Sequence, residues 1–548
     1  MSDKYAADEL NNLSREQMMN IIISLQDQVT QMNLNMEHLI EQIRLADQYR
    51  FGRHTERLDE IAGQMNLFNE VETYADNSDE PSGEEVIITA RKKKKKGQRD
   101  DDFKDLPREA HDHRLTDEQL DEFFGKDCWR RIKPDEYIRV RCQPAAYTVE
   151  AHSVDVAVGT KGDHQDEFLR GDRPKDLMRN SVATPSLMAA IMNTKYVNSN
   201  PLYRIENEFD RNGVHISRQT MANWVIRCSK QYFEPFIERL RQELLKRDVN
   251  QADETPVQVI NDNDPDDPND RKGSPGHKNF MWVHRSGELD KEPPIVLYEY
   301  QRTRHHRYPL EYYSGYKGVL MTDGLQQYHL LEKELEGLTS ANCWAHARRD
   351  YADAIKAAAK KNPETVKNSV AYQALARIGT IYKIEKPLRD LTPEERLKER
   401  QLTIGPLVDE YFTWIKKIRE SGTVLPKGKA SDGINYSINQ EKYLRVFLTN
   451  GKVPIDNSAS ERSIRTFCIG KKNWVFINSI KGAKASAAVY SICETAKLNN
   501  LNPYYYLDHL LTELPKLCDD DGNIDTAKLD PLLPWADELP AKCQKPRR

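Results

Sequence analysis

Three acidic residues lie in local settings that suit metal-dependent chemistry on phosphate. Asp253 precedes the apolar run 255–260, which predicts a strand. Asp323 ends the β-rich run 319–322 and precedes a glycine, a pattern typical of a strand that ends in a turn. Glu461 lies in a stretch that predicts a helix. Such carboxylates could hold two Mg²⁺ ions, because Mg²⁺ prefers oxygen ligands and a pair about 3.5–4 Å apart can stabilise both oxygens of a phosphodiester exchange.

Each carboxylate also has an ordinary explanation when it is taken singly. An Asp after a strand is a common turn residue, and a Glu-Arg pair on a helix usually forms a solvated face. Arg462 and Arg465 follow Glu461 closely and are candidates to support the site or reach phosphate. The chemistry therefore depends on whether the fold brings the three carboxylates together.

A second group of reactive side chains lies between Cys343 and Arg349. Cys343 and His346 are three residues apart and share one face if the segment is helical. His346 either supports the active site or belongs to the core, and the sequence leaves both interpretations open. Cys343 is more typical of a core residue. Arg348 and Arg349 are candidate contacts to DNA phosphate.

The stretch after Glu461 combines cations with aromatic residues. Phosphate contacts together with base stacking would suit a DNA strand end held at the metal ions. The aromatic residues could equally belong to the core. The candidate DNA-binding residues of this stretch are Lys471, Lys472 and Trp474, with Lys481, Lys484, Phe467 and Phe476 nearby.

The first 50 residues predict a coiled-coil helix. A capping-box pattern begins at Ser14, and apolar residues then recur four and three apart from Met18 to Ile43. This seam predicts that residues 1–50 pair two or more subunits. A single amphipathic helix packed on its own protein is the alternative.

The segments that follow are polar and mixed. Residues 51–72 predict a short helical segment, and residues 73–104 a charged flexible linker that could also clamp DNA. Residues 105–175 predict a small β-rich module, with short strands at 137–141 and 147–150. Its cysteines and histidines lack the spacing of a compact zinc site, so zinc is not expected.

Residues 176–246 predict a helical region with a helix-turn-helix layout. One helix is expected from Pro201 to Phe209, Gly213 fits a tight turn, and Ser217 can cap a second helix. Any helical hairpin could show this pattern, so DNA recognition is a hypothesis here. The residues that the second helix would present to base edges are Arg218, Gln219 and Asn223.

The three carboxylates fall in two separated parts of a predicted α/β catalytic core. The first part is residues 247–351 and the second is residues 451–512. Between them, residues 352–450 are rich in Lys, Glu, Ala and Leu and predict a helical insertion. Residues 513–548 predict a polar tail, in which the segment 532–535 is a candidate docking patch. The fold class is thus multidomain α/β.

The whole chain limits the class of protein. A chain of 548 residues is too long to fold around a single hydrophobic core, so several domains are predicted. The net charge is −5, so nucleic acid must be bound by local basic patches rather than by the overall field. The chain has no apolar run of membrane-span length, no apolar signal-peptide core and no C-x-x-C pair. We therefore expect a cytoplasmic protein with no membrane partner.

These motifs resemble the large transposases of the insertion-sequence-sixty-six family of bacterial elements. The resemblance extends over nearly the whole chain. The matching stretches are 50–53, 56–58, 195–196, 201–204, 252–256, 343–349, 454–465 and 469–474.

The resemblance implies an RNase H-like catalytic core with Asp253, Asp323 and Glu461 as the DDE residues that hold two Mg²⁺ or Mn²⁺ ions. It implies that the protein binds double-stranded DNA at the terminal repeats of an element, cleaves it and joins the 3′ end to target DNA by transesterification. It also implies a homodimer or higher oligomer, with or without companion proteins of the same element.

Two departures from the family pattern stand out. Similar proteins carry a Cys-rich zinc knuckle ahead of the helical region, and residues 105–175 lack its C-x-x-C pairs. DDE enzymes often have Lys or Arg seven residues after the catalytic Glu, and Cys468 stands there instead. Two other functions stay open: an RNase H-like DNA nuclease without strand transfer, and a non-catalytic DNA-binding regulator derived from a transposase.

Overall fold

The structure is a computed structural model, and it describes residues 181–545 except 263–278, 360–365, 425 and 520, with Glu118 and short pieces between 147 and 178. The predicted coiled coil, the short helical segment at 51–72 and the charged linker lie outside the described residues. So does most of the region 105–175.

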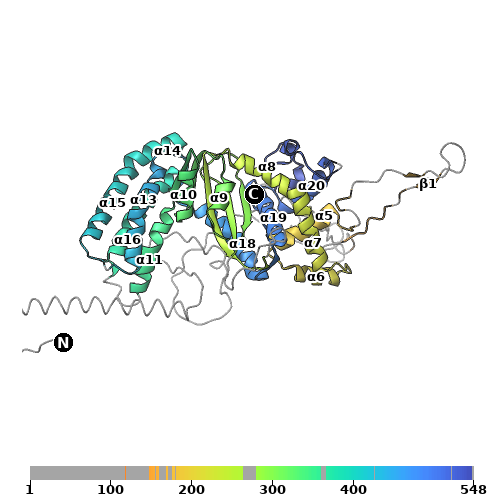
Figure 1. The fold of residues 1–548 in the computed structure, drawn as a ribbon, viewed down its shortest axis with the longest axis horizontal. Coiled ribbons are helices and arrows are strands. Elements are labelled where there is room, and N and C mark those ends of the chain that lie inside the picture. Colours follow the sequence, from red (N-terminus) through yellow and green to blue (C-terminus); the bar gives the residue numbers. More distant parts are fainter. Residues whose placement is uncertain are drawn as a thin grey trace, which may run out of the picture.

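A mixed five-stranded sheet lies at the centre of this part of the chain (Figure 1). Its middle strand is β3, with antiparallel β5 and then β6 on one side, and parallel β7 and then β8 on the other. The parallel strands need crossovers, and α10 (Gln326–Glu334) connects β7 to β8. The strands are β3 (Val249–Val257), β5 (Asn279–Ser286), β6 (Val296–Gln301), β7 (Gly318–Thr322) and β8 (Leu338–Asn342).

The strand expected at 255–260 begins earlier and is interrupted. Asp253 lies inside β3, the ladder ends at Val257, and β4 (Val259–Asn261) follows to pair in parallel with β9 (Ile477–Ser479). Pro256 is tolerated because β7 pairs only with the first three residues of β3. On that side of the strand the missing proline N–H therefore costs no ladder hydrogen bond.

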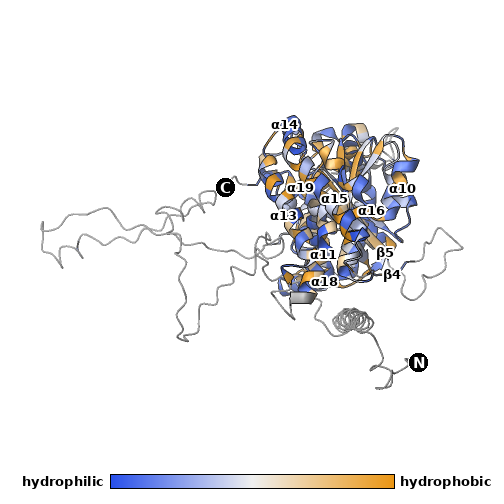
Figure 2. Ribbon diagram, turned by 90° about the vertical axis from the view of Figure 1, so that its left-hand side faces the viewer, coloured by the Kyte–Doolittle hydropathy of each residue, from blue (hydrophilic) through white to orange (hydrophobic). Residues whose placement is uncertain are grey.

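Helices form two groups with separate hydrophobic cores. One core joins β5 and β6 to the helices before β3 and after residue 458, and the other joins β7 and β8 to the helices between 344 and 444. In Figure 1, α13 to α16 lie to the left of the sheet, and α5 to α8 with α20 lie to the right. Figure 2 shows α13, α15 and α16 in mixed colours, as expected for amphipathic helices.

The helices have the following bounds. The first group comprises α5 (Pro185–Met192), α6 (Leu202–Arg211), α7 (Arg218–Cys228), α8 (Glu234–Leu244), α18 (Ser458–Trp474), α19 (Ile480–Leu498) and α20 (Pro503–Leu517). The second comprises α11 (Trp344–Ala359), α13 (Val370–Leu388), α14 (Pro393–Glu399), α15 (Gly405–Glu420), α16 (Lys429–Asn439) and α17 (Glu441–Leu444), with α9 (Arg307–Tyr312) beside the sheet. Shorter turns are the π-helical η2 (Asn193–Val197), η3 (Ser229–Phe233) and η4 (Arg400–Ile404), and the 3-10 segments η5 (Val446–Leu448), η6 (Thr526–Lys528), η7 (Asp530–Leu532) and η8 (Ala541–Cys543). Within the described ranges, none of the helices has the length and apolar character to span a bilayer.

The predicted helix pair near residue 210 is present as α6 and α7. Gly213 has φ +76° in the connecting turn, a conformation that favours glycine. Ser217 caps α7, since its Oγ accepts a hydrogen bond from the backbone N of Thr220 at 3.2 Å.

Two predictions about the ends of the described region are wrong. Residues 147–150 do not form a strand, and the Tyr147 ring packs edge-on against Phe209 at 5.4 Å instead; the described ladder nearby pairs β1 (Val156–Val158) with β2 (Phe168–Arg170). The segment 532–535 is not an open docking patch. Leu532 and Leu533 are buried in the first core, and Tyr506 donates a hydrogen bond to the Leu532 carbonyl at 2.7 Å.

Candidate functional site

Asp253 occupies the interior of the central strand and is largely removed from solvent. Its Oδ1 accepts a hydrogen bond from the backbone N of Glu254 at 2.8 Å. Burial raises the pKa of Asp253 well above its ordinary value, and the charges of Glu254, Asp323 and Glu461 raise it further. The structure therefore brings the three carboxylates named in the sequence analysis within electrostatic reach of one another.

Asp323 follows the last residue of β7, as the sequence pattern predicts. Its Oδ1 accepts from the backbone N of Leu325 at 3.0 Å, and its carbonyl accepts from the Tyr436 hydroxyl at 2.8 Å. Gly324 has φ +88°, and a Cβ there would lie 2.7 Å from Nδ2 of Asn342, so the turn requires glycine. Burial raises the pKa of the Asp323 carboxyl.

Glu461 lies in the first turn of α18, and Asn457 fixes where that helix begins. The Asn457 side chain donates to the carbonyl of Ala252 at 2.8 Å and accepts from Nε2 of Gln251 at 3.1 Å. Its backbone N lies 3.1 Å from Sγ of Cys343, which is fully buried as a core residue. The start of α18 is thereby tied to the part of β3 that precedes Asp253.

Two side chains of α11 face Glu461. Nη2 of Arg349 lies 3.3 Å from Oε1 of Glu461, and Nε2 of His346 lies 3.7 Å from the same oxygen. Burial, and then the charge of Arg349, lower the pKa of His346 to about 3, so its ring is neutral at neutral pH. The buried Nδ1 of His346 has no hydrogen-bond partner among the described residues.

The donor set suits a divalent cation. All three carboxylates offer oxygen ligands, and a bound cation would relieve the repulsion that raises the pKa of Asp253. Nevertheless, across the part of the chain that the structure covers, no three His, Cys, Asp or Glu side chains are gathered closely enough to form a complete metal site. Glu461 is instead directed at Arg349 and His346.

A fourth carboxylate, that of Glu254, lies beside these three and was not predicted from the sequence. Its Oε2 accepts from the Tyr328 hydroxyl at 2.6 Å and its Oε1 accepts from Nε of Arg304 at 2.7 Å, while the glutamate side chain is fully buried. Burial raises the pKa of Asp323, and the charge of Arg304 partly offsets this rise, which places the guanidinium at the edge of the site. The sequence feature that could have indicated a cation at the site is the basic run 302–307, which directly follows a strand.

Not every predicted support residue reaches the carboxylates. Arg462 pairs with Glu288, which also accepts from Nη2 of Arg389 at 2.8 Å, so Arg462 is directed to the far end of β5. Arg465 follows Glu461 by about one turn of α18 and is half-buried on that helix face.

The predicted DNA-contact residues divide into exposed and packed side chains. Trp474 packs edge-on against the buried Phe467 at 5.4 Å, and Nζ of Lys471 donates to the carbonyl of Pro256. Arg348 is half-buried. The exposed candidates are Arg218, Gln219 and Asn223 on α7, Arg349 on α11 and Lys472 on α18.

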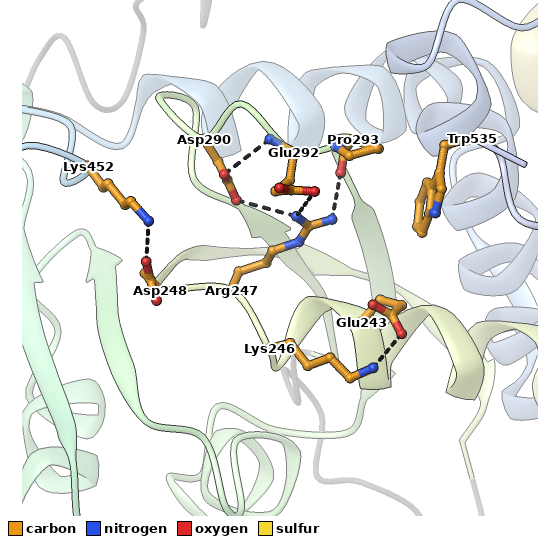
Figure 3. A pocket seen from close by; sticks show the side chains of 9 residues that line it. All are labelled: Glu243, Lys246, Arg247, Asp248, Asp290, Glu292, Pro293, Lys452 and Trp535. Carbon is orange, nitrogen blue, oxygen red and sulfur yellow. Dashed lines mark hydrogen bonds and ion pairs between the residues drawn. The ribbon is translucent and has the colours of Figure 1, made fainter. Parts of the chain in front are cut away.

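A cavity of about 350 Å³ lies beside the beginning of β3, at the opposite end of the strands (Figure 3). Arg247 reaches Glu292 at 3.4 Å and Asp290 at 3.8 Å, and Lys452 pairs with Asp248 just before β3. Its cationic side chains are thus already paired with acidic neighbours. The cavity is not part of the carboxylate site, which lies toward the other end of β3 and β7.

Carboxylates gathered on an α/β sheet beside exposed arginines suit chemistry on phosphodiesters, and comparison with known families agrees. The chain belongs to the family described as Transposase IS66 family, whose model matches residues 180–485. A model of the IS66 C-terminal element matches residues 491–535, and one described as Transposase C of IS166 homeodomain matches residues 38–110. The family predicted from the motifs is therefore confirmed.

Individual relatives are more distant. The chain is 26% identical over 389 residues to the uncharacterized protein y4qI of Sinorhizobium fredii, a match that covers 68% of this chain and 66% of that one. It is 26% identical to the uncharacterized protein y4hP of the same organism over 64% of this chain and 62% of the relative. The matches thus span less than two thirds of the length of these relatives.

Among solved structures, the Drosophila P element transposase strand transfer complex is similar at 12% identity and a TM-score of 0.34, over 57% of this chain and 92% of that one. A similarity this loose supports no argument about fold or function.

Proposed function

We propose that this protein is the transposase of a bacterial insertion sequence, and that it cuts the ends of its element and joins the 3′ ends to target DNA. The observation that supports this most strongly is the convergence of Asp253, Asp323 and Glu461 from the central strand, a neighbouring strand end and a helix. Family membership supplies the class of reaction. Both together favour an RNase H-like core with these residues as its DDE set.

Two Mg²⁺ or Mn²⁺ ions would be held by these three carboxylates, where they would activate the attacking hydroxyl and stabilise the leaving oxygen. The protein's own groups have separate roles. Asn457 holds the start of α18 against β3, and so fixes where Glu461 stands. Arg349 and Arg304 are cations at the edge of the site, placed to contact the phosphate of the bound strand.

DNA would be bound through more than one surface. The exposed face of α7 carries Arg218, Gln219 and Asn223, residue types that bond to base edges in the major groove. The homeodomain match at residues 38–110 supports a further DNA contact. The coiled coil predicted at 1–50 would pair subunits, which suits a reaction that joins two element ends.

The test is a strand-transfer assay with the full-length protein, Mg²⁺ or Mn²⁺, the DNA ends that flank its gene and a plasmid target. Glu461→Gln and Asp253→Asn should bind the ends and yield no cleaved or joined product, because each removes a metal ligand. Glu420→Gln, at an exposed position of α15, is the matched control and should act as the wild type. Cleavage without joining would favour a nuclease. Binding with neither reaction, even when companion proteins of the element are added, would favour a regulator.

A further inference from the structure

The helix that carries Glu461 ends in a strained turn. Val475 has φ +63° and ψ −54°, and the backbone N of Phe476 donates to the carbonyl of Trp474 at 2.8 Å. These values define a three-residue γ-turn in its rare, strained form. A β-branched residue at positive φ is a true outlier, and such strain persists where the surrounding structure holds it in place.

This turn places apolar side chains in solvent. Val475 is 59% exposed and Phe476 is 47% exposed. Ile260 on β4 is 49% exposed and points out of the small β4–β9 sheet, whose inward residues Val259 and Ile477 are buried. We name Val475, Phe476 and Ile260 the apolar ridge. The apolar ridge lies outside the core, to which the nearby aromatic Phe467 belongs.

The charge around the apolar ridge suits a nucleic acid. The sequence from 462 to 493 contains no Asp or Glu, and its cations include Lys472 and Lys481, which are exposed on either side of the turn. Exposed apolar side chains beside these lysines complement nucleobases carried on a phosphate backbone. Asp262, two residues after Ile260, is buried and pairs with Arg302 at 3.9 Å.

The apolar ridge stands at a fixed distance from the carboxylates. Glu461 and Trp474 are separated by 13 residues of α18, which spans about 20 Å at 1.5 Å per residue. The backbone N of Ile477 donates to the carbonyl of Gln258 at 2.9 Å, and so ties the turn to the strand segment that follows β3. For a duplex that runs along α18, at 3.4 Å per base step, the ridge would meet the bases roughly six base pairs from the cut.

We propose that the apolar ridge is a nucleobase-binding wedge. It enters the base stack of the element-end duplex about six base pairs from the scissile phosphate and holds a base out of the stack. Apolar side chains that insert between base steps in this way open and bend a duplex. The inference rests on the proposed function, since it requires that the protein binds element ends.

The test uses end duplexes that carry 2-aminopurine at each of the first ten positions in turn, bound by the full-length protein without divalent metal. Fluorescence should rise severalfold at one or two adjacent positions near the sixth with the wild type. Phe476→Ala should abolish the rise, and Phe476→Leu should keep part of it. Leu498→Ala, at an end of α19 where the leucine is 46% exposed, should keep all of it.

A second duplex carries an abasic site at the responsive position, so there is no base left to displace. The wild type should bind this duplex several times more tightly than the intact duplex, whereas Phe476→Ala should bind the two duplexes equally. Anisotropy measured on the same samples separates the outcomes. Wild-type protein that binds the ends without a fluorescence rise would refute the wedge and leave the proposed function standing. Absence of end binding by the wild type would refute both. An equal rise with a folded Phe476→Ala protein would also refute the wedge.

Discussion

Arg349 on α11 and Glu461 on α18 face each other at the candidate site, with Nη2 of the arginine 3.3 Å from Oε1 of the glutamate. The two residues are 112 positions apart in sequence. In the absence of bound metal, the guanidinium balances the charge of a carboxylate that stands near two others. The same arginine side chain is 56% exposed and so can also be reached by DNA.

Arg349→Ala should therefore change two kinds of binding in opposite directions. Affinity for Mn²⁺, measured by titration without DNA, should rise because a competing cation is removed from Glu461. Affinity for the element end should fall, with the slope of its salt dependence reduced by about 0.9 for the lost phosphate contact. Lys356→Ala, on the same helix, should alter neither. Unchanged Mn²⁺ affinity in Arg349→Ala would show that the ion pair does not govern the site.

Tyr328→Phe should destabilise the fold by about 1.5–3 kcal/mol in urea unfolding, because the buried Glu254 carboxylate loses a hydrogen-bond donor at 2.6 Å. Adding Glu254→Gln should recover part of this loss, since a neutral amide tolerates burial better than a carboxylate. Tyr372→Phe, at an exposed position of α13, is the control. A change below 0.5 kcal/mol in Tyr328→Phe would mean that Arg304 alone suffices to satisfy Glu254.

Gly470→Ala should destabilise the protein although alanine favours helices. A Cβ at this position of α18 would lie 2.2 Å from the hydroxyl oxygen of Tyr490, and overpacking of this kind costs about 1–3 kcal/mol. Tyr490→Phe removes that oxygen, so the double variant should recover most of the loss. Additive losses in the double-mutant cycle would contradict the predicted clash.

Lys195→Met should reveal a pH dependence with a defined sign. Burial lowers the pKa of Lys195 to about 8 from an ordinary value near 10.5. Between those values the unfolded chain holds more protons than the native protein, so native stability rises with pH. The stability of the wild type relative to Lys195→Met should thus increase by about 1.4 kcal/mol per pH unit between pH 8 and 10.

The control for this measurement is Lys333→Met, at an exposed position of α10. A wild-type advantage that falls as the pH rises would contradict the burial of Lys195. Buried tyrosines also contribute to the pH dependence of stability. Their contribution is the same in the wild type and in each variant, so it cancels in the difference.

Deleting residues 1–45 should lower the oligomeric mass measured by light scattering, because the predicted heptad seam lies there. The deleted protein should keep the thermal transition of its catalytic core. The same mass before and after deletion would show that subunits pair elsewhere.

Local sequence patterns predicted those elements whose signals are local. Asp323 at a strand end, Glu461 on a helix, and the α6–α7 pair all follow from strand, turn and cap residues that lie next to one another. The first half of β3 was not predicted as a strand, because Asn250 and Gln251 are polar yet fully buried. Their amides bond to Leu244 and Asn457, partners that no periodicity within the strand reveals.

The residues that surround the three carboxylates were harder to predict from the sequence than the carboxylates themselves. Glu254 and Arg304 meet across 50 residues, and Arg462 turns to Glu288 across 174. Such pairings depend on tertiary packing, which also determines that Trp474 lies against Phe467 while Phe476 stays outside. A basic stretch with aromatic residues therefore indicated a DNA surface without showing which aromatic residue was free.

The long helical segment between β8 and α18 affects the order in which the acidic residues are synthesised. Asp323 leaves the ribosome 138 residues before Glu461, which at about 5–20 residues per second is roughly 7 to 28 seconds of translation. During that interval the nascent chain displays the central strands without the last carboxylate. Under the proposed function, the chain would gain its full set of acidic ligands only when most of it has been synthesised, and a product truncated before residue 461 would lack one of them.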